Sequence, residues 1–489
     1  MNAFARILEW PIMPDDDTAL ALWSAGEIAA ATGGTPSTDF QAAGADIDSR
    51  DVAEGDLFFA LKGEAMDGHL FVDKAFAKGA AAAIVERPVE GPHVLVEDTS
   101  SALEALAKLS RNRAEARIIG VTGSVGKTGV KEAIFAALDR SSRGRAHRSV
   151  KSYNNHVGVP LSLTRMPARS KFGVFEMGMN HAGEIRALTA LVRPHVAVIT
   201  TIAPAHIENL GSEDAIARAK AEIFEGLEPG GVAIIPADSP HHARLRETAE
   251  QYAGAVVSFG RAVHADVRLL DAVPAPGGGS LVTADMGDRR ICYTVAEPGE
   301  HWILNSLAVI AAVRAAGGDM GAAGLALAEM RGLKGRGERH TIAAPGGDGS
   351  GSALLIDESY NANPASMRAT LAQLGVTPAR RRIAVLGAMK ELGEHGPAYH
   401  AALAEPIAAA GVDQLILVGD EMQALADELG KAVPPALGKV IAFAHCGTAG
   451  QALDALTQIG VQGGDALLIK GSNSVGLGAV VAALTKQEG

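Results

Sequence analysis

The stretch IIGVTGSVGKTGVKEAIFAAL, residues 118–138, joins an apolar segment to an amphipathic one through a glycine-rich turn. The common phosphate-loop template requires a glycine five positions before Gly126, where this chain has Val121. The setting otherwise fits, with a strand before the turn and a helix after it whose first N–H groups can bind phosphate oxygens. A glycine-rich turn that only packs a strand on a helix is the simpler alternative, but it gives no reason for the Gly-Lys-Thr ending. The stretch therefore predicts a nucleotide phosphate loop.

Such a loop divides its work among backbone and side-chain groups. The lysine ammonium contacts the β- and γ-phosphates, and the hydroxyl that follows it reaches Mg²⁺. We therefore expect Lys127 on the phosphates and Thr128 on the metal. The residues expected to bind ATP here are Thr122, Gly123, Ser124, Val125, Gly126, Lys127 and Thr128.

Charge and cysteine content narrow the function classes. The 489 residues carry a net charge of −12 and scattered basic residues, which argues against nucleic acid or an anionic membrane as the partner. Two cysteines cannot form a disulfide framework or a zinc cluster. Neither a signal peptide nor an apolar run of membrane-spanning length is found. We expect a soluble cytoplasmic protein without a membrane anchor.

The length predicts about three domains. Residues 1–115 mix short strands with helices, and residues 116–332 alternate apolar strands with helices, which is typical of a parallel sheet covered on both faces. After the Gly-, Lys- and Arg-rich segment 331–340, the alternation restarts over residues 333–489. The predicted fold class is α/β, with a mixed N-terminal domain, a central phosphate-loop domain and a Rossmann-like C-terminal domain.

The form T-G-S-x-G-K-T resembles the phosphate loop of the Mur ligases of peptidoglycan synthesis. Further strings occur in that family's order, and the resemblance covers nearly the whole chain; they include DSR, DGH, KSYNNHVG, HWILNSLAV, LKGRGERH, DESYNANP, LGAMKELG and LIKGSNSVGLG. The chain is most similar to the branch that joins D-alanyl-D-alanine to UDP-N-acetylmuramoyl-tripeptide with ATP. The resemblance thus implies a monomeric ligase that completes a cell-wall precursor through an acyl phosphate.

The resemblance also assigns cofactors and domain roles. It implies ATP and two Mg²⁺ ions in the central domain, the muramoyl peptide on the N-terminal domain and D-Ala-D-Ala on the C-terminal domain. Lys220 matches a lysine that relatives carry as a carbamate, although a helix lysine is usually a solvated charge. His206 matches a metal ligand or its neighbour, although a lone histidine is more often structural.

Glu176 can be argued from its position alone. It ends the apolar strand FGVFEM, and side chains at the carboxyl edge of a parallel sheet face the ligand crevice. A carboxylate suits Mg²⁺, while a solvated strand-end glutamate is the alternative. The expected catalytic set is Lys127, Glu176, His206, Lys220 and Arg336, and the expected metal ligands are Thr128, Glu176, His206 and carbamylated Lys220.

Other roles rest on the resemblance. Asn305 matches an adenine contact, Arg336 a hinge arginine that reaches the γ-phosphate, and Asn361 a nucleotide contact. Relatives carry two aspartates where this chain has Asp357 and Glu358, so which of the pair contacts the nucleotide stays open. The residues expected to face the muramoyl peptide or the dipeptide are Ser49, Arg50, Asp67, His69, Asn154, Asn155, Tyr360 and Asn363. Loop and turn structure is the alternative for each of these residues.

Two rival functions remain to be tested. The first is another amide ligase of the same superfamily; the DNPR string typical of the ligase that adds the third residue does not occur here. The second is a protein that uses ATP only to change shape. A ligase should release phosphate only when both the tripeptide and the dipeptide are present.

Overall fold

The computed structural model describes residues 21–63, 66–205, 207–276, 278–344, 351–431 and 442–486. Contacts divide these residues into two compact units. The first contains the chain up to Ala116 together with Ser149–Ser170, and the second contains Arg117–Arg148 and the chain from Lys171 onward. No helix among the described residues is long and apolar enough to cross a membrane.

The first unit is built on a mixed sheet in the order β2-β7-β6-β5-β4. Strands β4 to β7 run parallel, β2 is antiparallel to β7, and β1 and β3 form a separate antiparallel pair. The elements are β1 (Trp23–Ser24), α1 (Ala25–Thr32), β2 (Thr35–Pro36), β3 (Gln41–Ala42), β4 (Gly44–Asp46), β5 (Asp56–Phe59), η2 (Gly68–Phe71), α2 (Val72–Ala77), β6 (Ala82–Val85), β7 (His93–Leu95), α3 (Thr99–Arg113) and α5 (Gly158–Thr164).

Helix α5 comes from a distant part of the chain and packs on α3. Leu161 on α5 and Leu103 on α3 are buried in the same apolar core as Phe59. The indole Nε1 of Trp23 donates a buried hydrogen bond of 2.9 Å to the carbonyl oxygen of Thr164. The apolar core of the first unit is therefore completed by residues that lie beyond the phosphate loop in sequence.

The second unit begins with a sheet of nine described strands, ordered β16-β15-β14-β13-β12-β11-β8-β10-β9. All neighbouring strands from β9 to β14 in this order pair in parallel. Strand β15 pairs antiparallel with both β14 and β16. The strands are β8 (Arg117–Thr122), β9 (Ala146–Arg148), β10 (Phe172–Glu176), β11 (Val196–Ile199), β12 (Val232–Pro236), β13 (Ala255–Gly260), β14 (Val267–Pro274), β15 (Ser280–Asp285) and β16 (Arg290–Val295).

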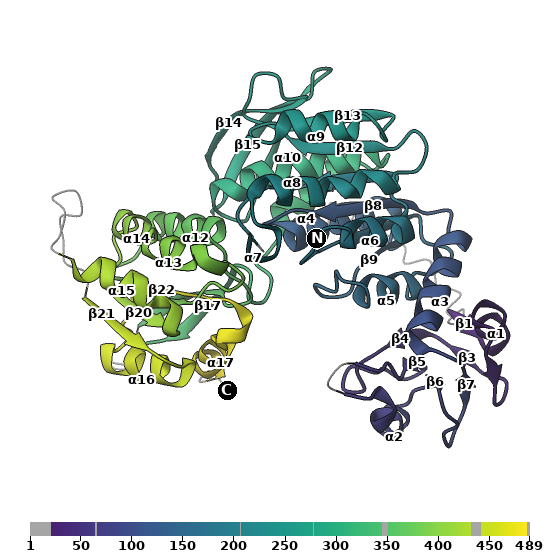
Figure 1. The fold of residues 1–489 in the computed structure, drawn as a ribbon. Helices are drawn as coiled ribbons and strands as arrows, with labels where there is room; N and C mark the ends of the chain where they lie inside the picture. Colours follow the sequence, from purple (N-terminus) through teal and green to yellow (C-terminus); the bar gives the residue numbers. More distant parts are fainter. Residues whose placement is uncertain are drawn as a thin grey trace, which may run out of the picture. The chain divides into compact units, whose positions relative to one another are not determined.

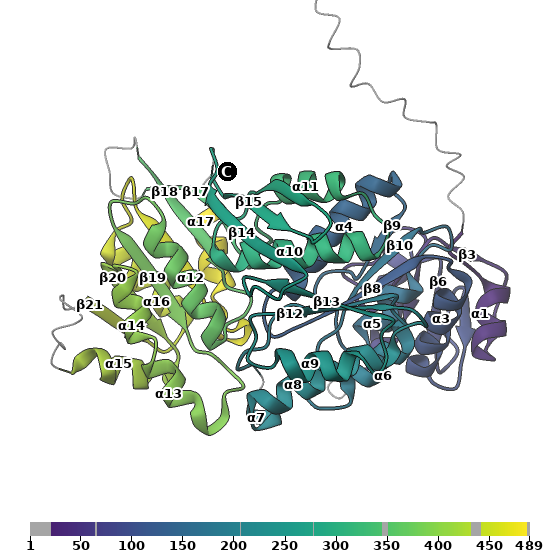
Figure 2. The same ribbon diagram turned by 90° about the horizontal axis from the view of Figure 1, so that it is seen from above.

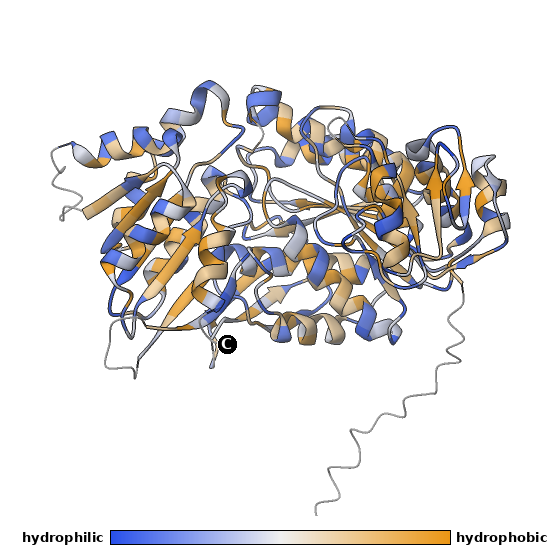
Figure 3. Ribbon diagram, turned by 90° about the horizontal axis from the view of Figure 1, so that it is seen from below, coloured by the Kyte–Doolittle hydropathy of each residue, from blue (hydrophilic) through white to orange (hydrophobic). Residues whose placement is uncertain are grey.

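Helices cover both faces of this sheet (Figure 2). One layer contains α4, α10 and α11, and the other contains α6, α8 and α9. The central strands β8, β10, β11 and β12 are apolar along most of their length because both faces of the sheet are buried there, whereas β14 and β16 expose several residues. In Figure 3, strands are drawn largely in the hydrophobic colour. The helices are α4 (Lys127–Ser142), α6 (Glu184–Val192), α7 (Ile207–Leu210), α8 (Glu213–Ala221), η3 (Glu222–Gly226), α9 (His242–Ala249), α10 (Glu300–Ala315) and α11 (Met320–Glu329).

The rest of the second unit is a sheet of six described strands, ordered β17-β18-β22-β19-β20-β21. Only β17 is antiparallel, and helices cover the two faces (Figure 1). The elements are β17 (Glu338–Ala343), β18 (Ser352–Glu358), α12 (Pro364–Val376), β19 (Arg382–Gly387), η4 (Gly393–His395), α13 (Gly396–Ala401), α14 (Ala404–Ala409), β20 (Gln414–Val418), η5 (Asp420–Met422), α15 (Gln423–Gly430), β21 (Ala442–Cys446), α16 (Ala449–Ile459), β22 (Ala466–Lys470), η6 (Asn473–Val475) and α17 (Gly478–Thr485).

The predicted α/β class, with a mixed N-terminal sheet and two largely parallel sheets, is confirmed. The limits predicted for the three domains, 1–115, 116–332 and 333–489, stay predictions. Strand β17 was not expected, because its sequence ERHTIA was interpreted as the end of a polar hinge. Its pairing with β18 depends on contacts along the whole register from Glu338 to Ala343, which no local pattern signals.

Candidate functional site

The phosphate loop connects β8 to α4 at the carboxyl edge of the nine-stranded sheet. Gly126 is the N-cap of α4, so the backbone N–H groups in the first turn of that helix face the loop. The loop is anchored to the segment after β11, since Ser124 Oγ donates to Ala203 O at 2.9 Å and Ser124 N donates to Thr201 O at 2.7 Å. A rigid backbone with N–H groups directed at one point is what a phosphate requires.

Gly123 must be glycine for two reasons. Its φ of +148° lies in a region that L side chains rarely adopt, and a Cβ there would collide with Thr200 Oγ1. That hydroxyl has no room to retreat, because it donates to Val125 O at 2.6 Å. The loop and the residue that follows β11 are therefore in direct contact at Gly123.

We expect Gly123→Ala to lower the free energy of unfolding by about 1–3 kcal/mol and to weaken ATP binding at least ~10-fold, since the loop must shift off its anchor. Denaturant unfolding and ATP titration measure the two effects. Gly430→Ala is the matched control because a Cβ at Gly430 meets nothing within 4 Å. Wild-type ATP affinity in Gly123→Ala would show that the loop tolerates the side chain.

Lys127 curls back over the loop that precedes it. Its Nζ donates to Gly123 O at 2.7 Å. Burial lowers the pKa of Lys127, the carboxylate of Glu176 opposes that shift, and Arg336 adds to it. Lys127 therefore lies within electrostatic range of Glu176, the predicted metal ligand, and of Arg336.

Thr128 and Glu176 form a direct contact, with Thr128 Oγ1 donating to Glu176 Oε2 at 2.8 Å. Glu176 is fully buried and Thr128 is 6% exposed. A hydroxyl and a carboxylate oxygen beside a phosphate loop are hard ligands, which Mg²⁺ prefers. A buried carboxylate also calls for a cation. The residues present therefore fit a Mg²⁺ ion at this position.

Lys220 lies on α8 and is 1% exposed. Burial, followed by repulsion from Lys127, lowers its pKa well below the ordinary value for lysine. Within the described part of the chain, no carboxylate forms an ion pair with it. A lysine in that environment favours the neutral amine, the form that reacts with CO₂. His206, the other predicted metal ligand, lies outside the described residues.

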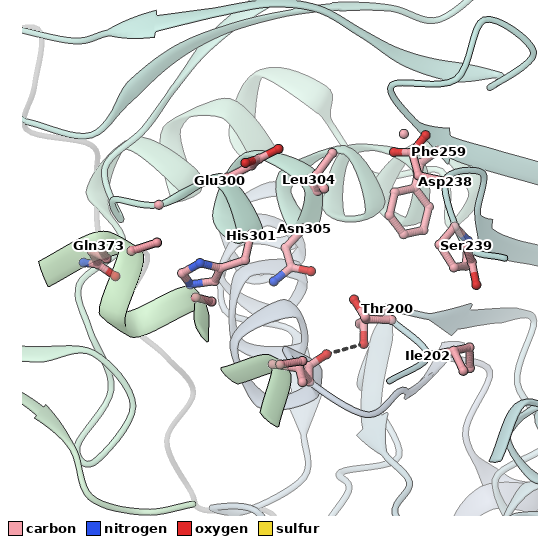
Figure 4. Close-up of a pocket in the computed structure, with 18 of the residues that line it drawn as sticks. Thr200, Ile202, Asp238, Ser239, Phe259, Glu300, His301, Leu304, Asn305 and Gln373 are labelled. Atoms are coloured by element: carbon pink, nitrogen blue, oxygen red, sulfur yellow. Dashed lines mark hydrogen bonds between the residues drawn. The ribbon is translucent and has the colours of Figure 1, made fainter. Parts of the chain in front are cut away.

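A cavity of about 620 Å³ opens beside the phosphate loop. It is lined by Val125 of the loop, Thr200 after β11, Phe259 of β13, and His301 and Asn305 of α10. Figure 4 shows His301 and Asn305 projecting from the same helix on the side that faces Thr200. A largely apolar cavity with a few polar groups fits the base and ribose of a nucleotide. Asn305 lines this cavity, and its contact with the adenine stays a prediction.

Family models match three segments of the chain. The Mur ligase family catalytic domain matches residues 42–115, the Mur ligase middle domain residues 121–313, and the Mur ligase glutamate ligase domain residues 347–473. The UDP-N-acetylmuramoyl-tripeptide–D-alanyl-D-alanine ligase of Synechocystis is 38% identical, over 89% of this chain and 90% of its own. The chain belongs to the Mur ligase family.

Solved structures of Mur ligases agree with this assignment. MurF from Acinetobacter baumannii superposes with a TM-score of 0.79 at 30% identity, covering 95% of this chain and 99% of its own. MurF from Thermotoga maritima, solved in complex with ADP, gives 0.71 at 26% identity, covering 91% and 97%. The fold of the chain is therefore the three-domain α/β fold of the Mur ligases.

Several predicted residues lie close together around Arg336 and residues 358–361. The guanidinium of Arg336 lies over the ring of Tyr360, 4.1 Å from its centroid. Lys470 Nζ, on the neighbouring strand β22, donates to Glu358 Oε2 at 3.2 Å and to Asn361 O at 3.0 Å. Lys470 was not predicted as a site residue, although it ends the apolar strand ALLIK, and the same position on another strand identified Glu176.

Several predicted substrate residues have structural partners. Asn363 caps α12, accepting from Ser366 N at 2.9 Å. Asn155 accepts from Gly158 N at 2.9 Å at the start of α5, the predicted turn role for an asparagine. Of the two asparagines in KSYNNHVG, Asn154 also has a partner. The substrate roles of these residues stay predictions.

The DGH motif in the first unit is also organised internally. Asp67 caps η2 and bonds to His69 Nδ1 at 2.7 Å, while His69 Nε2 accepts from Glu86 N at 2.8 Å. Hydrogen bonds from the backbone and ring of His69 hold the pKa of Asp67 well below its usual range. Both ring nitrogens of His69 are thus engaged within the protein.

The arginine of the DSR motif is more exposed to solvent than the side chains of the DGH motif. The side chain of Arg50 is 87% exposed and pairs with Asp48 at 2.6 Å, while Ser49 is 8% exposed. The Arg50 hydrogen bond lowers the pKa of Asp48 to about 2. Arg50 is therefore the group of these motifs that a ligand can reach directly.

Glu297, which follows β16, gives a pH-dependent prediction. Burial raises its pKa to about 7; Arg339 opposes this and Glu358 adds to it. Because the folded state binds the proton more tightly, the free energy of unfolding should fall as pH rises from about 4.5 to about 7. We expect Glu297→Gln to remove that slope, worth about 1–3 kcal/mol.

Denaturant unfolding at pH 5, 6, 7 and 8 measures this. Glu300→Gln is the matched control, since Glu300 lies three residues further on with an exposed side chain. The raised pKa of Glu297 would be refuted by an identical pH slope in wild type and Glu297→Gln.

Proposed function

We propose that this Mur ligase joins D-alanyl-D-alanine to UDP-N-acetylmuramoyl-tripeptide, consuming ATP and releasing ADP and phosphate. The observation that carries the proposal is the phosphate loop with the Thr128–Glu176 contact, in a chain similar along most of its length to ligases of that name. The product is a peptidoglycan precursor, which links the enzyme to cell-wall growth, shape and division.

The chemistry has two steps. A carboxylate oxygen of the tripeptide attacks the γ-phosphorus of ATP, and the bond to the bridging oxygen breaks as ADP leaves. The amine of D-Ala-D-Ala then attacks the resulting acyl phosphate, and phosphate departs as the amide forms and the amine loses a proton. Negative charge accumulates in both steps, so positioned cations supply much of the catalysis.

The side chains have defined parts in that scheme. Lys127 would leave Gly123 O and bind the phosphates, and Arg336 would add a second cation from the hinge. Thr128 and Glu176 would hold Mg²⁺. When bound, Mg²⁺ neutralises phosphate charge and orients the phosphoryl group.

Lys220 is proposed to carry a carbamate. Its amine nitrogen forms a bond to the carbon of CO₂ and releases one proton, which replaces a buried amine by an anion. That anion would offer oxygen ligands to a second Mg²⁺, with His206 as its neighbour. The low pKa and full burial of Lys220 support the proposal, because the neutral amine is the reactive form.

Phosphate release tests the proposed function. It should require both UDP-MurNAc-tripeptide and D-Ala-D-Ala, and mass spectrometry should find the pentapeptide product. Hydrolysis that ignores the dipeptide would favour the shape-changing ATPase, and another amine acceptor would favour a different ligase. The predicted monomeric state and cytoplasmic location stay proposals, the first tested by sedimentation.

A further inference from the structure

The hinge turn that carries Arg336 is built on the carboxylate of Asp357. Asp357 Oδ2 accepts from Gly335 N at 3.0 Å, and Asp357 Oδ1 accepts from Ser359 N at 3.0 Å. Its backbone carbonyl accepts from Gly337 N at 2.9 Å. Asp357 is 2% exposed, and its carboxylate accepts from the backbone N–H groups of the residues that immediately precede Arg336 and Tyr360.

The turn itself has little freedom. Arg336 N donates to Leu333 O at 2.7 Å, and Tyr360 N donates to Gly335 O at 3.1 Å. Gly335 has a φ of +71°, and a Cβ there would lie 2.8 Å from the Cβ of Tyr360. The main chain on both sides of the Arg336 side chain is therefore fixed against residues 357–360.

The result is a defined place for the guanidinium. It stacks on Tyr360 at 4.1 Å from the ring centroid, and a cation over an aromatic face is attracted by the charge distribution of the ring. Arg336 is also close enough to the phosphate loop to affect Lys127. Glu358, the next residue after Asp357, is turned instead toward Lys470.

We infer that Asp357 is a positioning residue that acts through Arg336, and that it does not itself bind the nucleotide. Its carboxylate holds the turn, the turn holds Arg336 against Tyr360, and Arg336 serves the phosphoryl group. This inference rests on the proposed function for the role of Arg336. It also separates the roles of the two acidic residues at this position, since the side chain of Glu358 pairs with Lys470 and not with the turn.

A double-mutant cycle tests this with Asp357→Asn, Arg336→Ala and the double variant in the full-length enzyme. An amide keeps the shape but replaces one acceptor oxygen by a donor facing an N–H group. We expect Asp357→Asn to lower kcat about 10- to 100-fold, as a misplaced catalytic group does, with the Kd for ATP within about 3-fold of wild type. In the Arg336→Ala background it should lower kcat less than about 3-fold further.

Hydrogen exchange provides a readout that does not depend on ligation. Peptides that contain Gly335 should exchange faster in Asp357→Asn, while peptides of the phosphate loop should not. Asp465→Asn is the matched control, because Asp465 is 3% exposed in the same domain and accepts from Gln462 N at 2.7 Å. It should leave kcat and the Gly335 peptides unchanged.

Gly335→Ala is the second variant in case Asp357→Asn does not fold. It disturbs the turn with Asp357 intact and should also lower kcat with little change in ATP affinity. A Kd for ATP weakened ~10-fold or more by Asp357→Asn, with the loss of kcat persisting beside Arg336→Ala, would overturn the inference. Full activity in Gly335→Ala would also overturn it. If wild type itself does not ligate, the proposed function fails, while the exchange and ATP-binding results still judge the turn.

Discussion

Replacing Lys127 by alanine should lower kcat for phosphate release at least ~10³-fold, because the cation proposed to bind the transferred phosphoryl group is lost. The side chain lies over the loop at Gly123 O, so its loss removes one hydrogen bond and little of the core. Stopped assays with both substrates measure kcat, and titration with ATP measures Kd.

The control for this variant lies on the same helix. Arg140→Ala removes a cation near the end of α4 that pairs at the surface with Glu329, and surface pairs contribute little to stability. It should retain wild-type kcat. If Lys127→Ala retained wild-type kcat and ATP affinity, the phosphate-loop interpretation would be wrong.

Replacing Lys220 by alanine should lower kcat ~100-fold or more, since the proposed carbamate, an anionic ligand for Mg²⁺, could no longer form. Lys220→Arg should be equally impaired, because arginine keeps the charge but does not form the carbamate. Short-chain carboxylic acids should restore part of the activity of Lys220→Ala by supplying a carboxylate. With ¹³CO₂, wild type should give one carbamate resonance that the variant lacks.

Arg218→Ala is the matched control on α8, since Arg218 pairs with Asp214 at the surface at 2.7 Å. It should keep both the resonance and the activity. Lys220→Ala without any rescue, together with an unmodified lysine in a metal-bound structure of wild type, would exclude the carbamate.

The parallel core could be predicted because its signals are local. Strand β8, the loop and α4 are contiguous in sequence, and strands buried on both faces are apolar throughout. Glu176 was predictable for the same reason, since its position at the end of an apolar strand fixes which edge of the sheet it occupies.

Roles that depend on distant contacts could not be predicted. The hydrogen bond from the backbone N–H of Gly335 to the carboxylate of Asp357 joins residues 22 positions apart. Sequence motifs also do not separate a residue that binds a ligand from one that organises the loop around it. Asn363 and His69 lie in matched motifs, yet their polar atoms already have partners within the chain.

Helix α5 has a consequence for how this polypeptide emerges from the ribosome. The indole N–H of Trp23 donates to the carbonyl oxygen of Thr164, 141 residues later, and Leu161 packs in the same apolar core as Phe59. The apolar core of the first unit therefore cannot be completed until residues that are synthesised after β8 and α4 are available. The first two folding units thus cannot fold strictly in sequence order. A nascent chain stalled at residue 116 would expose unfilled apolar surface to chaperones, and a recombinant fragment cut there would do the same.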